Sequence, residues 1–586
     1  MLGLTQARTR SLPHMPPWAN LSRRASSLLT DLPIAFVGFG LFYGLLALAR
    51  YWATPVQPQA QIDLSPRALP LYALFSLARI AAAYLLSLVF SLGYGYLAAQ
   101  SAKAERFMIP VLDTLQSIPV LSFLPGVMLS MAALFPSTQF GLELGSILLI
   151  FTGQVWNMAF SVYSSLKSIP REMLEAARLY RLSRWQRFFQ LDLPYSAISL
   201  IWNSMMSVAG GWFSLMVCEM FTLGNRDLRL PGLGSYLQSA SNAGDARAIA
   251  WGLTAMVAVI VLLDQLVWRL AIAWSDKFKF EQVEASEIPR SPVLDFLRRS
   301  RLISRAQAMA APAREAFILH FARGWAREGV AAQTRGSARW MSRVFSVIAL
   351  AGVFYTAVRM TAMLGALSLK DLREIALGAG ATFLRVELTL ALAALWTIPV
   401  GILIGLKPRL AAIAQPLAQI AASIPAPALF PVVLLLLIRI GGGLGIASIV
   451  LLLLGTQWYI LFNVIAGASA IPSDLKEVCG IFRLTEIQRW RTLLLPAIFP
   501  YLITGFVTAS GGAWNASIIA EYFRFRGQTF SIRGLGALIS RATDKGDFPL
   551  LLGATIAVSL MVVVVNRLVW RRLYAIASTK FRLDFS

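Results

Sequence analysis

The sequence has 586 residues, of which 57% are hydrophobic and only 14% are charged, so it lacks the charged surface of a soluble domain and indicates a membrane protein with many spans. The net charge of +24 lies mostly in short basic loops between apolar runs, which is typical of cytoplasmic loops and argues against nucleic-acid binding. Two cysteines and two histidines exclude a disulfide framework and a zinc site, and we expect no metal.

Apolar runs long enough to cross a bilayer recur along the chain in two sets of six. The first set comprises 32–49, 70–98, 107–133, 142–165, 196–222 and 248–274, and the second comprises 343–364, 377–406, 411–438, 444–466, 497–521 and 550–573. We therefore expect an all-α membrane protein with about 12 transmembrane helices. Basic residues gather in alternate loops and near both ends, which predicts that both termini are cytoplasmic.

This pattern divides the chain into five regions. They are a cytoplasmic segment with the first span (1–66), a first repeat unit (67–275), a basic cytoplasmic linker (276–342), an extra span (343–376) and a second repeat unit (377–586). The linker is rich in Arg and Ala. It is either a surface helix that lies on anionic lipid or a solvated tether between the two units.

The two sets of spans are copies of one unit. Gly210-Gly-Trp212 recurs as Gly512-Ala-Trp514, and the Gly-Leu-Gly at 232–234 recurs at 534–536, in both cases 302 residues later. Ser117-Ile-Pro119 recurs 306 residues later at 423–425. A parallel duplication relates two halves by an axis along the membrane normal, and it predicts a translocation path between them.

Each half carries a polar loop of the same design between its fourth and fifth spans. Ile-Pro opens a short helix whose apolar residues follow the i, i+3, i+4, i+7 pattern, and Ser183 or Thr485 is placed to cap a second helix. The stripes consist of Met173, Ala176, Ala177 and Tyr180 in the first loop and Leu475, Val478, Cys479 and Phe482 in the second, beside Glu175 and Glu477. Such a pair of helices fits a groove on a cytoplasmic partner. The alternative is a helix that lies in the lipid interface.

These loops resemble the EAA loop of ABC importer permeases. Glu175 and Glu477 each lie 19 residues before the proline of a Leu-Pro pair, as that loop requires. Arg181 and Arg483 replace the family's Gly, and Val-Cys replaces the second Ala-Ala. Gly is expected there because the turn is left-handed, so each Arg would cost roughly 1 kcal/mol. Leu115-Gln-Ser-Ile-Pro, Phe123-Leu-Pro and Val217-Cys-Glu narrow the resemblance to nitrate/sulfonate/taurine-type permeases.

The resemblance implies two type I ABC importer permease domains, fused in one chain of a bacterial inner membrane. It also implies two copies of a cytoplasmic ABC ATPase and a periplasmic solute-binding protein that delivers a small solute, an anion of the nitrate, sulfonate or taurine kind. No Gly-Lys dipeptide occurs, so a phosphate-binding loop is excluded. We expect no enzymatic activity and no cofactor of its own, because a separate subunit would bind the ATP.

A few residues are candidates for the path itself. Acids near the outer ends of the fifth spans either serve a pore or gate or simply reach the outer interface. Glycines in the same spans allow close packing or bending, and an asparagine lines a polar path or bonds to a neighbouring helix. These candidates are Gly210, Gly211, Glu219, Gly511, Gly512, Asn515 and Glu521.

Two other functions are compatible with a duplicated set of spans. An ion-coupled secondary transporter usually carries charged or unwound residues at mid-membrane, which are sparse here. A membrane scaffold without transport gives no reason for paired Gly-rich spans. Phosphate and an organic cation stand as alternative solutes.

Overall fold

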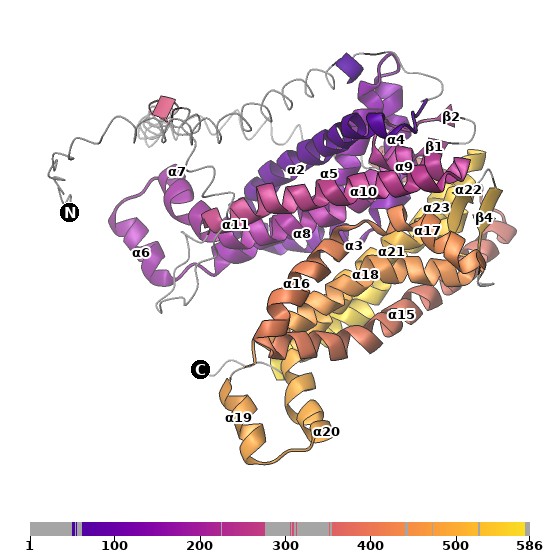
Figure 1. Ribbon diagram of the computed structural model, residues 1–586. Helices are drawn as coiled ribbons and strands as arrows, with labels where there is room; N and C mark the ends of the chain where they lie inside the picture. The colour runs from indigo at the N-terminus through magenta and orange to yellow at the C-terminus, as the bar shows by residue number, and fades with distance from the viewer. Residues whose placement is uncertain are drawn as a thin grey trace, which may run out of the picture.

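The computed structural model shows two helical bundles side by side, one from each half of the chain (Figure 1). The structure describes residues 61–275 and 354–580, apart from 224–225, 440–442, 472 and 526–527, with isolated residues in 50–54 and 305–351. The expected first span at 32–49, nearly all of the 276–342 linker and the start of the extra span at 343–364 lie outside these residues.

The first half is helical except for one short hairpin. Its helices are α2 Leu69–Gln100, α3 Ala102–Ser117, α4 Leu124–Leu134, α5 Phe140–Lys167, α6 Arg171–Leu179, α7 Arg184–Arg187, α8 Leu193–Glu219, α9 Leu233–Ala243, α10 Ala246–Leu263 and α11 Arg269–Ser275. The 3-10 segments are η1 Pro66–Ala68 and η2 Val120–Phe123, the π-helical segments are η3 Phe188–Asp192 and η4 Asp264–Trp268, and the strands are β1 Thr222–Leu223 and β2 Arg226–Asp227.

The second half repeats this order. Its helices are α15 Leu369–Leu406, α16 Pro408–Ser423, α17 Ala426–Arg439, α18 Leu444–Ser469, α19 Ser473–Ile481, α20 Glu486–Arg489, α21 Leu495–Ala520, α22 Leu535–Lys545, α23 Phe548–Val565 and α24 Arg571–Lys580. The π-helical segments η6 Trp490–Leu494 and η7 Asn566–Trp570 and the antiparallel strands β3 Tyr522–Phe525 and β4 Gln528–Ser531 complete it. The all-α membrane class predicted from composition is confirmed.

The predicted count of about twelve spans is not confirmed within the described residues. Within the described residues, eight helices are long and apolar enough to cross a membrane, or nine if one bent pair counts as a span. The runs predicted as continuous spans at 107–133 and 411–438 are broken, and α16 and α17 meet at 81°. Both breaks fall at an Ile-Pro pair, where Ile118 (ψ 127°) and Ile424 (ψ 116°) are extended. Proline forces the residue before it out of the helical region, so the helix ends there.

The second repeat unit also begins earlier than predicted. Helix α15 starts at Leu369, before the expected boundary at 377, because Ser368 caps it through a hydrogen bond from the backbone N–H of Asp371. Residues 354–364 of the expected extra span are helical.

Three long helices form the core of each half. Helix α5 packs between α2 and α8, and α18 packs between α15 and α21. Small residues make these contacts close. A Cβ added to Gly95 would lie 2.8 Å from the Val162 side chain, and one added to Gly401 would lie 2.7 Å from that of Val464. Trp212 and Trp514, which occupy equivalent positions, are both buried in these cores.

Candidate functional site

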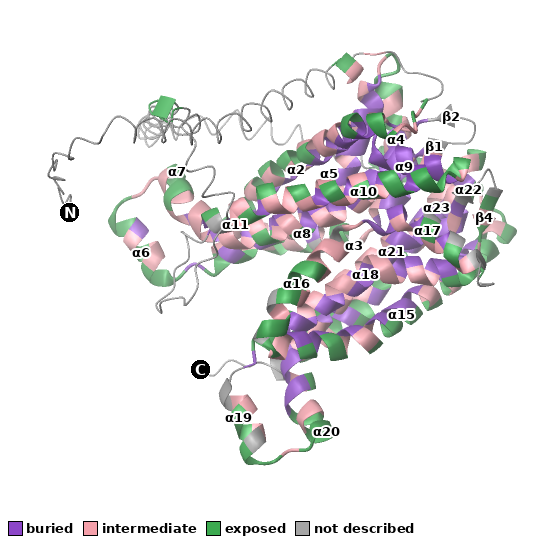
Figure 2. Ribbon diagram, in the orientation of Figure 1, coloured by how far each residue is buried: buried purple, intermediate pink, exposed green. Residues whose placement is uncertain are grey.

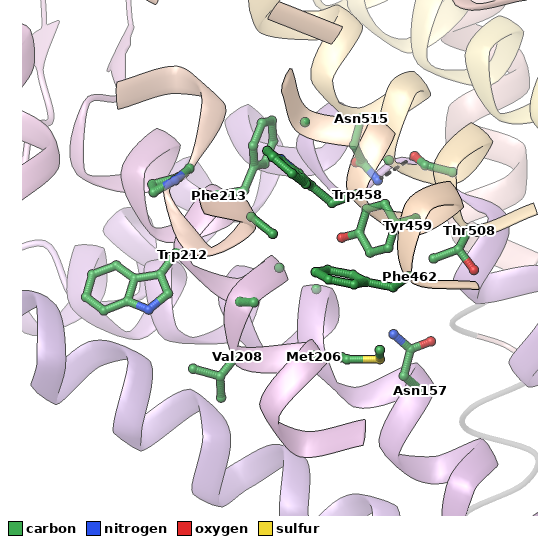
Figure 3. A pocket seen from close by; sticks show the side chains of 18 of the residues that line it. Asn157, Met206, Val208, Trp212, Phe213, Trp458, Tyr459, Phe462, Thr508 and Asn515 are labelled. Atoms are coloured by element: carbon green, nitrogen blue, oxygen red, sulfur yellow. Dashed lines mark hydrogen bonds between the residues drawn. The ribbon is translucent and has the colours of Figure 1, made fainter. Parts of the chain in front are cut away.

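A cavity of about 520 Å³ lies between the two halves. Helices α5 and α8 line it on one side and α18 and α21 on the other, while the Ile424-Pro425 break closes part of the wall. Figure 3 shows Trp458, Tyr459 and Phe462 of α18 together with Phe213 of α8 around this space. A cavity that both repeats share is where a parallel duplication predicts a translocation path.

The predicted pore residues divide between the cavity and the helix packing. Gly210, Gly511, Gly512 and Asn515 line the cavity. Gly211 instead faces Gln154 of α5, whose side-chain amide occupies the space where a Cβ would lie. Asn515 does both things that the sequence allowed: it lines the cavity, and its Oδ1 accepts a hydrogen bond from the Leu121 N–H at 3.4 Å.

The two acids lie elsewhere. Glu219 is 0% exposed and is not among the residues that line the cavity. Its Oε1 accepts hydrogen bonds from Arg79 Nη1 at 2.7 Å and Ser76 Oγ at 2.6 Å, and its Oε2 accepts one from the Gly234 N–H at 2.7 Å. Arg79 also binds Glu143 through two hydrogen bonds of 2.6 Å. The carboxylate therefore ties α8 to α2 and to the start of α9.

The second half repeats this arrangement with one carboxylate fewer. Glu521 accepts hydrogen bonds from Arg385, from Thr382 Oγ1 at 2.7 Å and from the Gly536 N–H at 2.8 Å. Gly534 provides the necessary space, because any Cβ at that position would overlap the Glu521 carboxylate. The duplicated Gly-Leu-Gly motif is thus a seat for a buried acid.

Sequence reasoning missed the arginines that hold these acids. Arg79 lies inside an apolar span and is 0% exposed, and Arg385 lies 306 residues later in the equivalent span. That spacing is the same as the one between the two Ser-Ile-Pro copies. A search for charged residues that recur at the repeat spacing would have found both. Within the described part of the chain, no group of His, Cys, Asp or Glu side chains is arranged to hold a metal.

The two predicted loops project from the same end of the bundles, opposite the strands (Figure 1). Ser183 and Thr485 cap the second short helix as predicted, and each forms a reciprocal pair with the glutamine three residues later. Arg181 (φ 49°) and Arg483 (φ 48°) adopt the left-handed conformation expected at the family's Gly position. The loops therefore keep the turn despite the substitution.

The stripes on these loops are only partly exposed (Figure 2). In the first loop Tyr180 is 81% exposed, whereas Ala177 is 7% exposed and Met173 and Ala176 are half-buried. In the second, half-buried and exposed positions alternate. Val478 and Phe482 are exposed there, and Leu475 and Cys479 pack against the main apolar core. Glu175 and Glu477 are both exposed. Charge at Ala177 would therefore disturb folding as well as docking, which makes Tyr180 the sharper test position.

The first loop has an extra anchor at its base. Lys167, at the end of α5, forms a 2.6 Å ion pair with Glu105 of α3, and the Tyr163 hydroxyl donates to the same carboxylate at 2.6 Å. The hydrogen bond from Lys167, and after it the one from Tyr163, hold the pKa of Glu105 below its usual range. The equivalent positions in the second half are Ala411, Ile465 and Ser469, so this anchor is absent there.

Both halves match one family, described as the binding-protein-dependent transport system inner membrane component, over residues 91–277 and 397–582. The chain belongs to this family. It is a fused permease with two copies of the family's domain, and it is thus a multi-pass membrane transport protein of a family of permeases rather than of enzymes.

The similar proteins are named as permeases of transport systems. The nitrate import permease protein NrtB of Leptolyngbya laminosa is 29% identical over 196 residues, which are 33% of this chain and 65% of that protein. The bicarbonate transport system permease protein CmpB of Synechococcus elongatus is 33% identical over 141 residues, 24% of this chain and 49% of that protein. The putative aliphatic sulfonates transport permease protein SsuC of Bacillus subtilis is 23% identical over 208 residues, 35% and 70%. The chain spans about half to two thirds of the first two relatives.

Proposed function

We propose that this chain forms the translocation path of an ATP-driven importer in a bacterial inner membrane. In this proposal, two copies of a cytoplasmic ABC ATPase dock on the loops 169–194 and 471–496, and they bind the ATP. A periplasmic binding protein delivers a small solute, an anion, to the opposite end. Both termini lie on the cytoplasmic side, as the distribution of basic residues favours.

The pair of projecting loops carries this proposal. Each has an exposed apolar residue at its tip (Tyr180 or Phe482) that follows a short helix and precedes a left-handed turn at an arginine. Exposed aromatic side chains on a monomer's projecting loops are typical of protein interfaces. Each loop then runs without a break through η3 or η6 into a helix that lines the cavity. A movement of the loop would therefore be transmitted directly to the helix that lines the cavity.

The names of the three relatives described above support an anionic solute, since nitrate, bicarbonate and sulfonates are all anions. The division of the chain supports the architecture. One family domain on each side of a shared cavity gives a path from one chain, with one docking loop for each of two ATPases.

Docking can be tested by co-expressing the chain with an ABC ATPase and purifying the complex through a tag on the chain. Tyr180→Asp combined with Phe482→Asp should abolish co-purification and uptake at unchanged membrane abundance, because a charge buried without a partner costs several kcal/mol. The matched controls Tyr180→Phe and Phe482→Tyr keep an aromatic ring and should retain both. Normal ATPase binding by the Asp variants would mean that these loops are interfacial helices and would remove the support for an importer.

The stoichiometry gives a second test. Because one chain supplies both loops, the purified complex should contain one permease chain and two ATPases, measurable by native mass spectrometry. Two permease chains with two ATPases would contradict the proposal. Uptake that persists when ATP hydrolysis is blocked, and that stops when the ion gradient is dissipated, would instead favour the ion-coupled transporter.

A further inference from the structure

The two walls of the cavity differ in chemistry although they come from one repeated unit. Helix α8 presents Met206, Val208 and Phe213, and 302 residues later α21 presents Thr508, Ser510 and Asn515 at the equivalent positions. At these three positions α8 is thus apolar, and α21 carries hydroxyl and amide groups. Figure 3 shows side chains of both walls around the space.

Helices α5, α18 and α21 offer donors that are not used within the described part of the chain. Tyr459 Oη makes no hydrogen bond there, and Asn157 Nδ2 has no partner although its Oδ1 accepts from Gln116 at 3.4 Å. Asn515 uses one amide N–H on the Gly511 carbonyl at 3.3 Å and keeps the other. Unused donors around a space favour a solute that carries acceptor oxygens.

No lysine or arginine is among the described residues that line the cavity, and Asp264 is its only acid. A compact inorganic anion would therefore find no fixed positive charge, and it has no apolar surface to place against Met206 and Phe213. Transfer of such an anion from water into this cavity would therefore be unfavourable. The volume of about 520 Å³ falls within the range of pockets that hold organic molecules.

We infer that this cavity is a transit site for an organic oxyanion with a short apolar chain, a sulfonate or a carboxylate, and not for a bare inorganic anion. The apolar chain lies on the α8 wall, and the oxygens accept hydrogen bonds from Tyr459, Asn157 and Asn515. Neutral donors hold an oxyanion without a fixed countercharge, which allows release toward the docking loops. This inference rests on the proposed function, since it names the solute of the same path.

The full-length chain, purified in lipid nanodiscs with its ATPase, allows a direct binding test. Trp156, Trp202 and Trp458 line the cavity, so their fluorescence reports occupancy. Hexanesulfonate or hexanoate should produce a saturable change, and nitrate and sulfate at matched ionic strength should produce none. The comparison of the two hexyl compounds separates the sulfonate source from the carboxylate source.

The equivalent residues of α21 provide a natural replacement for the apolar residues of α8. The graft Met206→Thr, Val208→Ser, Phe213→Asn places on α8 the residues that α21 already carries, and it should weaken hexyl binding at least tenfold. Tyr459→Phe removes one donor without changing the shape and should weaken it about tenfold. Leu85→Thr with Val89→Ser adds similar polarity at positions of α2 that are 60% and 70% exposed, outside the cavity, and should change nothing.

Equal responses to nitrate, sulfate and the hexyl compounds would overturn the inference, as would unchanged hexyl binding in both the graft and Tyr459→Phe. If the graft does not fold, Phe213→Asn alone replaces it. ATPase co-purification, measured on the same samples, depends on the loops and not on the cavity. If the unsubstituted chain binds neither hexyl compound but retains the ATPase, only the solute class is overturned. If it binds them but does not associate with the ATPase, only the proposed function is overturned.

Discussion

The two halves of this permease share their backbone and differ in their side chains. Both break a predicted span at an Ile-Pro pair, insert π-helical turns at equivalent places and seat an acid on a Gly-Leu-Gly loop. The first half adds Glu143 to its buried cluster, where the second half has one carboxylate. In the cavity, three apolar residues of α8 stand where α21 carries Thr508, Ser510 and Asn515. Fusion lets each half vary alone, which two identical subunits could not do.

The largest difference is expected at the buried arginines. Arg79→Met leaves Glu143 and Glu219 without their partner, and both acids are 0% exposed, so the loss of stability should be about 3–5 kcal/mol. Arg385→Met strands one carboxylate, and Arg385 is 13% exposed, so its loss should be smaller. The comparison is made between melting temperatures of the detergent-purified chains, which are measured by size-exclusion chromatography after heating.

Neutralising the whole first cluster provides the control. Arg79→Met combined with Glu143→Gln and Glu219→Gln should recover most of the lost stability, because no buried charge is then left unpaired. Equal melting temperatures for Arg79→Met and Arg385→Met would show that Glu143 adds nothing to the first cluster.

The next difference concerns how α5 packs on α8. The first half has Gln154 facing Gly211, and at the equivalent positions the second half has Thr456 and Ala513, all of them buried. A Cβ at Gly211 would overlap the Gln154 amide, so Gly211→Ala should destabilise the chain by about 1–3 kcal/mol through overpacking. Adding Gln154→Thr, which installs the second half's pair, should restore the melting temperature.

Neighbouring glycines provide the matched controls. Gly511→Ala should leave stability unchanged, since nothing lies within 4 Å of the added Cβ. Gly512→Ala places its Cβ 3.4 Å from the Tyr459 ring, so the fold should be kept while the cavity narrows and uptake falls. A stable Gly211→Ala single variant would contradict this account of the α5–α8 contact.

The caps at Ser183 and Thr485 could be predicted because they depend on local residue types. The repeat was found by comparing the two halves, and the left-handed turns were implied by the resemblance to the EAA loop. The break at Ile118-Pro119 was local too, but it was hidden within an apolar run whose hydropathy suggested a continuous span. The burial of Ala177, on the predicted docking stripe, could not be predicted. Amphipathic spacing identifies a face of a helix, and only the tertiary fold decides what that face meets. Arg79 needed its distant partners before it could be understood.

The smallest expected effect is also the one in which the halves should agree. Arg181 and Arg483 hold the left-handed conformation, which is unfavourable by roughly 1–2 kcal/mol for a residue with a Cβ. Glycine relieves this but loses more entropy on folding, so Arg181→Gly and Arg483→Gly should each stabilise their loop by at most about 1 kcal/mol. The backbone amides of Leu182 and Leu484 donate hydrogen bonds of 3.1 Å to the carbonyls of Ala177 and Cys479. These amides exchange with solvent only when the loop opens locally. Their hydrogen exchange should slow by up to about fivefold. Arg→Ala variants keep the Cβ and should leave exchange unchanged, so equal slowing by Ala would show that the arginine side chain, and not its backbone, sets the stability of the loop.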